Sequence, residues 1–158
     1  MPELRAGLSE AGFENVQTYL QSGNVVLATE LPPAALGAAV AELVAERFGV
    51  DIGVVVRTPD ELAEVVARNP LRRLATNPKR YQVTFLDGEP KADALRVLEA
   101  AAAGGEQLAA VGRELYTWHP DGIGRSKLAR LLSGKGLGVT ATSRNWTTVT
   151  ALLALATE

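Results

Sequence analysis

The sequence contains no cysteine, a single histidine, few aromatic residues and no long apolar run. Without cysteine the chain can form neither disulfide bonds nor thiolate or zinc–thiolate sites. One histidine among scattered acids offers no cluster with the spacing of metal ligands, so neither a metal nor a cofactor is expected. No stretch of about 18 apolar residues could span a membrane, and the opening MPELRAGLSEAGF lacks the basic start and apolar core of a signal peptide. These absences predict a cytoplasmic protein.

The composition that remains is that of an ordinary globular protein. The 158 residues are 47% apolar and 22% charged, enough for one compact domain or two small intertwined ones. The formal charge of −2 argues against broad electrostatic capture of nucleic acid, so a nucleic-acid partner is not expected. From Arg113 onward, six Lys and Arg face three acids, a balance of +3 against −5 for the preceding part. A modestly basic C-terminal third suits a small anion site.

The first half of the chain alternates helical and strand patterns. The predicted elements are a helix over 3–12, strands over 15–20 and 25–29 joined by a QSGN turn, a helix from Pro32 to Phe48, a strand over 51–57 and a helix from 58 to 68. Thr58 and Glu61 have the spacing of a capping box at the start of the last helix. The order matches a split βαβ (ferredoxin-like) unit whose first, central strand is missing.

The second half repeats that order in full. The predicted elements are a strand over 80–86, a helix over 90–103, a hairpin around Gly112, a short helix over 126–133, a weak strand over 137–142 and a closing helix capped by Ser143. We therefore predict an α+β fold of two ferredoxin-like halves packed together, 1–69 and 80–158, joined by a linker over 70–79 that two Asn-Pro steps mark. The first strand of the N-terminal half either lies upstream of Met1 or is supplied by another chain, which leaves a homo-oligomer open.

The segment HPDGIGRSKLARLL, residues 119–132, is the first candidate for a binding site. Gly122 and Gly124 form a turn ahead of a helix, where exposed backbone N–H groups favour an anion. Arg125 could hold two oxygens of that anion, Lys127 supplies a point charge, and Ser126 could donate its hydroxyl. The spacing is neither a GxxxxGK[ST] phosphate loop nor a GxGxxG fingerprint. The alternative is a structural turn in which Ser126 only caps the helix.

A second candidate, SRNWTTV, lies at the start of the closing helix. Arg144 and Trp146 could hold a phosphate and stack a base, with Asn145 beside them. Alternatively, Trp146 anchors the core and Asn145 caps the helix. If Arg125, Lys127 and Arg144 converge, both segments belong to one anion site.

Two further polar groups could suggest catalysis. Gln21, Ser22 and Asn24 cluster in the QSGN segment, but a hairpin turn needs such residues for its geometry, and Ser22 lacks the G-x-S-x-G surroundings of a nucleophile. His119 lies two residues before Asp121. A catalytic triad would need His119, a serine and a carboxylate to meet, and nothing in the spacing demands it.

The same segments resemble a known family. LRAGLSEAGFENVQTYLQSGNVVL, VVVRTPDELAEVVARNP, LYTWHPDGIGRSKL and SRNWTTVTALLAL together resemble the bacterial DUF1697 family of uncharacterised proteins. Members of that family usually begin about 20 residues earlier, with a strand and a GINVGG-like loop that this sequence lacks. The resemblance implies two related α+β halves and no established activity, ligand or catalytic residue.

The leading hypothesis is a cytoplasmic protein that binds a phosphate-bearing small molecule or nucleotide at the DGIGRSK turn. One alternative is an enzyme on a phosphorylated or acyl substrate with His119 as acid or base. Another is a protein-interaction module that uses the sheet edge left open by the missing strand.

Overall fold

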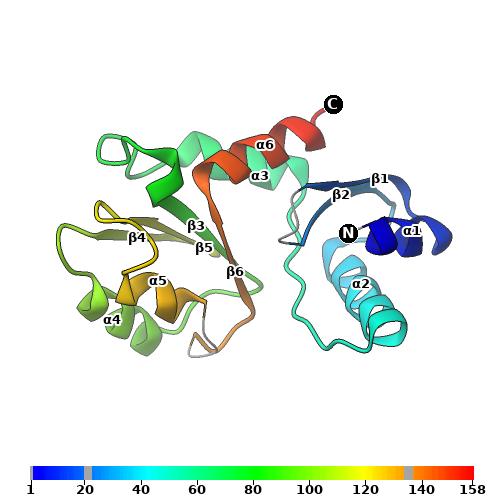
Figure 1. Cartoon of the computed structure of the whole chain (residues 1–158), viewed down its shortest axis with the longest axis horizontal. Helices are drawn as coiled ribbons and strands as arrows, with labels where there is room; N and C mark the ends of the chain where they lie inside the picture. Colours follow the sequence, from blue (N-terminus) through cyan, green and yellow to red (C-terminus); the bar gives the residue numbers. More distant parts are fainter. Residues whose placement is uncertain (1, 20–22, 134–136) are drawn as a thin grey trace. The chain divides into compact units, whose positions relative to one another are not determined.

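The computed structural model describes residues 2–19, 23–133 and 137–158, and the chain divides into two compact units. Unit 1 is formed by Met1–Leu62 and Ala151–Glu158, and unit 2 by Ala63–Thr150. Each unit carries one antiparallel sheet, and helices accompany both (Figure 1). The predicted α+β class is therefore confirmed.

Unit 1 is built around a hairpin and two helices. Helix α1 (Pro2–Glu10) leads into strands β1 (Glu14–Tyr19) and β2 (Asn24–Ala28), and α2 (Pro33–Phe48) follows. Its α2 ends as the sequence predicts, because Gly49 takes the left-handed conformation at φ 66° and closes the last turn. The buried side chains include Leu8, Val16 and Val44. Part of the predicted QSGN turn, residues 21 and 22, lies outside the described residues.

The strand predicted over 51–57 does not form, so that prediction was wrong. The segment has no regular secondary structure and packs against α2, where Val56 Cγ2 lies 3.5 Å from the place a side chain on Gly37 would occupy. No strand of the described part of the chain pairs with it. A strand needs hydrogen bonds to a neighbouring strand as well as a suitable composition, so the apolar residues of this segment do not by themselves make it one.

Unit 2 contains a four-stranded sheet in the order β4-β5-β3-β6, antiparallel throughout. Its strands are β3 (Tyr81–Leu86), β4 (Gln107–Val111), β5 (Glu114–Trp118) and β6 (Ala141–Asn145). A short 3-10 turn, η1 (Pro78–Arg80), precedes β3; α4 (Ala92–Ala101) connects β3 to β4, and α5 (Lys127–Leu132) connects β5 to β6.

Helices cover both faces of this sheet. Beneath it in Figure 1, α4 and α5 lie together and close a leucine core formed by Leu86, Leu98, Leu115, Leu128, Leu132 and Leu137. On the other face, the Tyr116 hydroxyl donates to the carbonyl of Val65 in α3 (Pro59–Arg68) over 2.8 Å. There Tyr81 meets the ring of Trp146, which begins α6 (Trp146–Ala156), at a centroid distance of 5.0 Å. The sheet is thus buried on both sides, which fixes the loops at its ends.

Strand β6 covers 141–145 and not the predicted 137–142, and the predicted cap Ser143 does not cap the closing helix. Ser143 lies opposite Thr84 in the ladder, and the two hydroxyls are hydrogen-bonded over 2.7 Å. The ladder continues to Asn145, whose side chain accepts the N–H of Thr148 over 3.0 Å and caps α6. Pairing with β3 therefore outweighs the local capping preference of Ser143.

Candidate functional site

The turn that follows β5 is held to the sheet by backbone hydrogen bonds. The N–H of His119 donates to the carbonyl of Arg80 over 2.9 Å, and the N–H of Gly122 donates to the carbonyl of His119 over 3.0 Å. Gly122 takes a φ of 93°, a conformation that side chains disfavour. The Arg80 guanidinium also donates to the carbonyl of Pro120 over 2.5 Å. The glycine turn thus has a defined path, as its composition suggested.

Ser126 faces inward at the end of this turn. It is buried, and its Oγ accepts the N–H of Ala129 over 3.0 Å, which makes it the N-cap of α5. Its hydroxyl proton goes to Glu106 Oε2, 2.5 Å away. Both roles of this hydroxyl are therefore taken inside the fold, and the structural interpretation of Ser126 accounts for it fully.

Glu106 and His119 complete a buried polar network with Ser126. A carboxylate only accepts, so His119 Nδ1 carries a proton and donates it to Glu106 Oε2 over 2.6 Å. The same nitrogen lies 3.1 Å from Ser126 Oγ, and Thr117 Oγ1 lies 2.8 Å from His119 Nε2. His119 is fully buried and Ser126 is 5% exposed, so these hydrogen bonds form away from water.

The pKa of the Glu106 carboxyl is held below its ordinary value. Burial by itself raises this pKa, because it disfavours the charged form. Hydrogen bonds from Ser126, from His119 and from the N–H of Ala103 stabilise the carboxylate and outweigh burial. The Glu106 carboxylate is therefore charged, and its hydrogen bonds join the loop before β4 to the turn after β5.

The network brings a serine, a histidine and a carboxylate together, yet not in the order of a nucleophilic triad. In a triad the serine hydroxyl bonds one histidine nitrogen while the carboxylate bonds the other. Here Glu106 and Ser126 share Nδ1, and the serine proton points to the carboxylate. The remaining nitrogen, Nε2, faces Thr117 in the interior. The arrangement can orient a turn; it does not present an activated serine to a substrate.

Two neighbouring glycines allow the loop before β4 to approach the turn. A side chain on Gly104 would lie 3.0 Å from Asp121 Oδ2, and one on Gly105 would lie 3.5 Å from the ring of Pro120. Both glycines have positive φ, 61° and 88°. The close approach places Glu106 within reach of His119 and Ser126.

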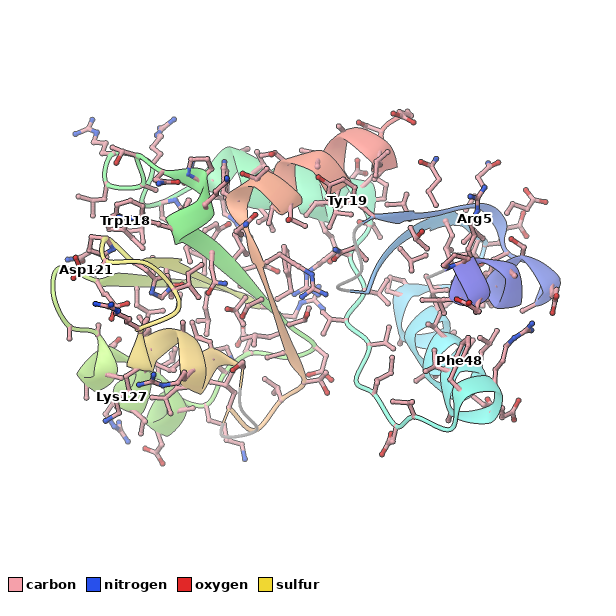
Figure 2. All side chains as sticks on the ribbon, viewed as in Figure 1. Arg5, Tyr19, Phe48, Trp118, Asp121 and Lys127 are labelled. Carbon is pink, nitrogen blue, oxygen red and sulfur yellow. The ribbon has the colours of Figure 1, made fainter. Side chains whose placement is uncertain are left out.

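Arg125 and Lys127 flank the buried serine and are both exposed. In the part of the chain that the structure describes, neither forms an ion pair or a side-chain hydrogen bond. No atom lies within 4 Å of the place that a side chain on Gly122 or Gly124 would occupy, so the surface of the turn is open. Figure 2 shows Lys127 and Asp121 on the same side of unit 2. Of the predicted anion-site residues, these two cations and two glycines are presented on the surface.

Arg144, Asn145 and Trp146 have other surroundings. Arg144 and Tyr116 both pair with Val83 in the sheet, so Arg144 projects from the sheet face opposite to that of His119. Its guanidinium donates to Thr142 Oγ1 and to the carbonyl of Ser143, over 2.6 and 2.8 Å, and burial lowers its pKa. Asn145 caps α6, and Trp146 packs on Tyr81, so these residues follow their structural interpretation.

Glu106 was not among the residues predicted for a site, because it belongs to none of the motifs in the sequence. The pairing register of the hairpin predicted around Gly112 could have revealed it. In the observed register, Gln107 lies opposite Trp118, so the next pair outward would be Glu106 and His119. Extending the hairpin by one pair would have brought the carboxylate to the histidine.

A hollow in unit 1 is another surface feature that could hold a ligand. A hollow of about 660 Å³ in unit 1 is lined by residues of α1, α2 and the loops beside them, among them Glu42, Glu46 and Arg47. It contains none of the predicted site residues. Within the described ranges, no group of three or more His, Cys, Asp or Glu side chains could hold a metal ion. Among the described helices, none has the length and apolar character needed to cross a membrane.

Comparison with known proteins finds a matching family model and a similar solved structure. Residues 1–116 match the model of the family described as "Protein of unknown function (DUF1697)". A conserved bacterial protein, SP0830 from Streptococcus pneumoniae, has a similar solved structure, with a TM-score of 0.75 and 17% identity over 99% of this chain and 88% of that one. At that identity the likeness concerns the fold alone. A search of curated proteins gave no match. The family model covers most of the chain and agrees with the resemblance of its motifs, and the chain belongs to the DUF1697 family.

Proposed function

We propose that unit 2 binds a phosphate-bearing ligand at the turn after β5, through Arg125 and Lys127. The observation that carries this proposal is that three consecutive residues face different ways: Ser126 is buried, and Arg125 and Lys127 are exposed. Ser126 points inward and ties the turn to Glu106, while the cations on either side of it are exposed and unpaired in the described structure. A rigid support under two free cations lowers the entropic cost of fixing them on a ligand.

The chemistry of the two cations favours phosphate oxygens. The planar guanidinium of Arg125 can hold two oxygens at once, and the Lys127 ammonium adds a point charge. The open surface at Gly122 and Gly124 leaves room for the ligand to approach the backbone. We leave Ser126 and Arg144 out of the proposed site, since both already have partners inside the fold.

We also propose that unit 2 has ferredoxin-like topology. Its order β3-α4-β4-β5-α5-β6, with strands arranged as β4-β5-β3-β6, supports this assignment. In unit 1 the hairpin β1-β2 and α2 follow the same order without the two strands that would complete it.

Calorimetric titration with inorganic phosphate and pyrophosphate tests the proposed site. Arg125→Ala should weaken binding about 10- to 100-fold, since hydrogen bonds to charged groups contribute about 1.5–3 kcal/mol each. Lys127→Ala should have a smaller effect, because it removes a point charge alone. Arg130→Ala is the matched control: it removes one exposed cation from α5 outside the turn. If Arg125→Ala and Lys127→Ala both bind phosphate as tightly as the wild type and the Arg130→Ala control, the turn is excluded as the site.

A second candidate function is strand addition in unit 1, favoured by segment 54–56, which belongs to no helix or strand. This segment is half-buried against α2 without a ladder partner in the described structure, and β2 pairs with β1 alone. A second copy of the chain could supply the pairing strand. Sedimentation velocity over a hundredfold range of concentration tests this candidate. A monomer at every concentration would exclude self-association.

A further inference from the structure

The charges of the chain are divided unequally between its two units. Unit 2 contains thirteen lysines and arginines against eight acids, a formal charge of +5. Unit 1 contains three basic residues against ten acids, a formal charge of −7. The net charge of −2 is therefore the sum of two units of opposite charge. Whole-chain charge argued against a nucleic-acid partner, and that argument does not apply to unit 2 alone.

Within unit 2 the cations concentrate in the segment between α3 and β3. Residues 69–80, NPLRRLATNPKR, contain four cations and no acid. All four side chains are exposed: Arg72, Arg73, Lys79 and Arg80. In the described structure none of them forms an ion pair. Four unpaired like charges so close in sequence repel one another, and an anionic partner would relieve that repulsion.

Hydrogen bonds hold this segment beside the glycine turn. The Tyr81 hydroxyl donates to Asn69 Oδ1 over 2.7 Å, which ties the start of the segment to β3. At its end, Arg80 donates to the carbonyl of Pro120 in the turn. The segment and the turn therefore meet at one end of the sheet, where the central strand β3 begins and its neighbour β5 ends.

An aromatic ring lies at the same end of the sheet. Trp118 is the last residue of β5, pairs with Tyr81 and is partly exposed. In the view of Figure 2, it lies between the loop that follows α3 and the turn with Asp121. We call Trp118 together with Arg72, Arg73, Lys79 and Arg80 the basic edge. An accessible indole among cations is the combination that binds unstacked bases and their phosphates.

We propose that the basic edge binds single-stranded nucleic acid. The arginines and Lys79 contact successive phosphates, and a base stacks on Trp118. Paired bases inside a duplex could not reach the indole, so the ring favours a single strand over a double one. The inference builds on the proposed function, because Arg125 on the adjoining turn would take a further phosphate of the same strand.

Binding of a fluorescein-labelled twelve-residue oligo(U) to the full chain, followed by anisotropy at several salt concentrations, tests the inference. The double variant Arg72→Ala/Arg73→Ala should bind at least tenfold more weakly. Its plot of log affinity against log salt should be less steep by about 1.4, since each phosphate contact on a single strand contributes about 0.7 to that slope. The control Arg96→Ala/Arg130→Ala loses two exposed cations from α4 and α5 and should change the affinity less than twofold.

Tryptophan fluorescence supplies an independent readout. The oligonucleotide should quench the fluorescence of the wild-type chain, and Trp118→Phe should lose that quenching while Trp146 still emits. Wild-type affinity in Arg72→Ala/Arg73→Ala, or equal weakening in the control, would overturn the basic edge. If inorganic phosphate still requires Arg125 in that case, the proposed function stands without this extension. If the oligonucleotide depends on the basic edge while phosphate binding ignores Arg125, the turn fails and the basic edge stands.

Discussion

Replacing Glu106 with glutamine measures how much the buried network stabilises unit 2. The carboxylate accepts from His119 and Ser126 through one oxygen, and both donors are buried. A glutamine can present its amide oxygen to both donors, but that oxygen carries no full charge, and the amide NH2 then faces the N–H of Ala103 that Glu106 Oε1 accepts. Hydrogen bonds to a charged group contribute about 1.5–3 kcal/mol each, and neutral ones about 0.5–1.5 kcal/mol. We therefore expect Glu106→Gln to lower the free energy of unfolding by about 2 kcal/mol.

Urea unfolding is a suitable assay because both tryptophans of the chain, Trp118 and Trp146, belong to unit 2. With a slope of about 2 kcal/mol per molar urea, the loss moves the unfolding midpoint down by about 1 M. Glu99→Gln, an exposed glutamate on α4, should leave the midpoint unchanged. A midpoint for Glu106→Gln equal to that of the wild type would refute the stabilising role of the network.

The pH dependence of the same measurement gives a second check. Because the folded pKa of Glu106 lies below its ordinary value of 4.5, the carboxylate stabilises the fold fully above that value. Its contribution is lost as the pH falls through the folded pKa, when the carboxyl takes up a proton. The difference in unfolding free energy between wild type and Glu106→Gln should therefore narrow below pH 4.5. A difference that stays constant into strong acid would contradict this origin of the stabilisation.

Three other substitutions test the structure around the sheet. Ser126→Ala removes the cap of α5 and a bond to the network, so it should cost about 1–2 kcal/mol in the same assay. Asn145→Ala removes the cap of α6 and should cost about 1 kcal/mol. Glu114→Gln breaks a largely buried ion pair with Arg68, 2.5 Å long, and should cost about 3 kcal/mol. Asp93→Asn, which breaks an exposed pair on α4, should leave the midpoint unchanged.

Each of these expectations has an opposite outcome that would contradict it. A Ser126→Thr variant keeps the capping hydroxyl, so a loss as large as that of Ser126→Ala would show that packing, and not the cap, is responsible. If Asn145→Ala has no effect, the cap of α6 contributes nothing measurable. If Asp93→Asn costs as much as Glu114→Gln, burial does not distinguish the two ion pairs.

Local signals of the sequence predicted most elements because the tertiary structure agrees with them. Thr58 and Glu61 form both bonds of the predicted capping box, over 2.9 and 3.2 Å. Gly49 ends α2, and the hairpin around Gly112 forms. Each of these features depends on residues a few positions apart, so the sequence contains the information needed to recognise it.

The predictions that failed depend on pairing with distant residues. The segment 51–57 has the composition of a strand, but a strand also needs a neighbour, and the described structure gives it none. Serine is a favoured helix N-cap, but the hydroxyl of Ser143 is hydrogen-bonded to that of Thr84 on β3 instead. Composition indicates the secondary structure that a segment favours by itself. Whether the segment forms a strand also depends on pairing with residues distant in sequence.

The proposed site at the glycine turn depends on a distinction that the sequence could not make. The structural turn and the anion site were alternatives for one motif, yet they use different residues of it. Ser126 faces inward and serves as the cap that the structural interpretation requires. Arg125 and Lys127 face outward, because neighbours of an inward residue at the start of a helix are turned away from the core. The confirmed cap therefore does not count against anion binding; it provides the fixed support on which two exposed cations can act together.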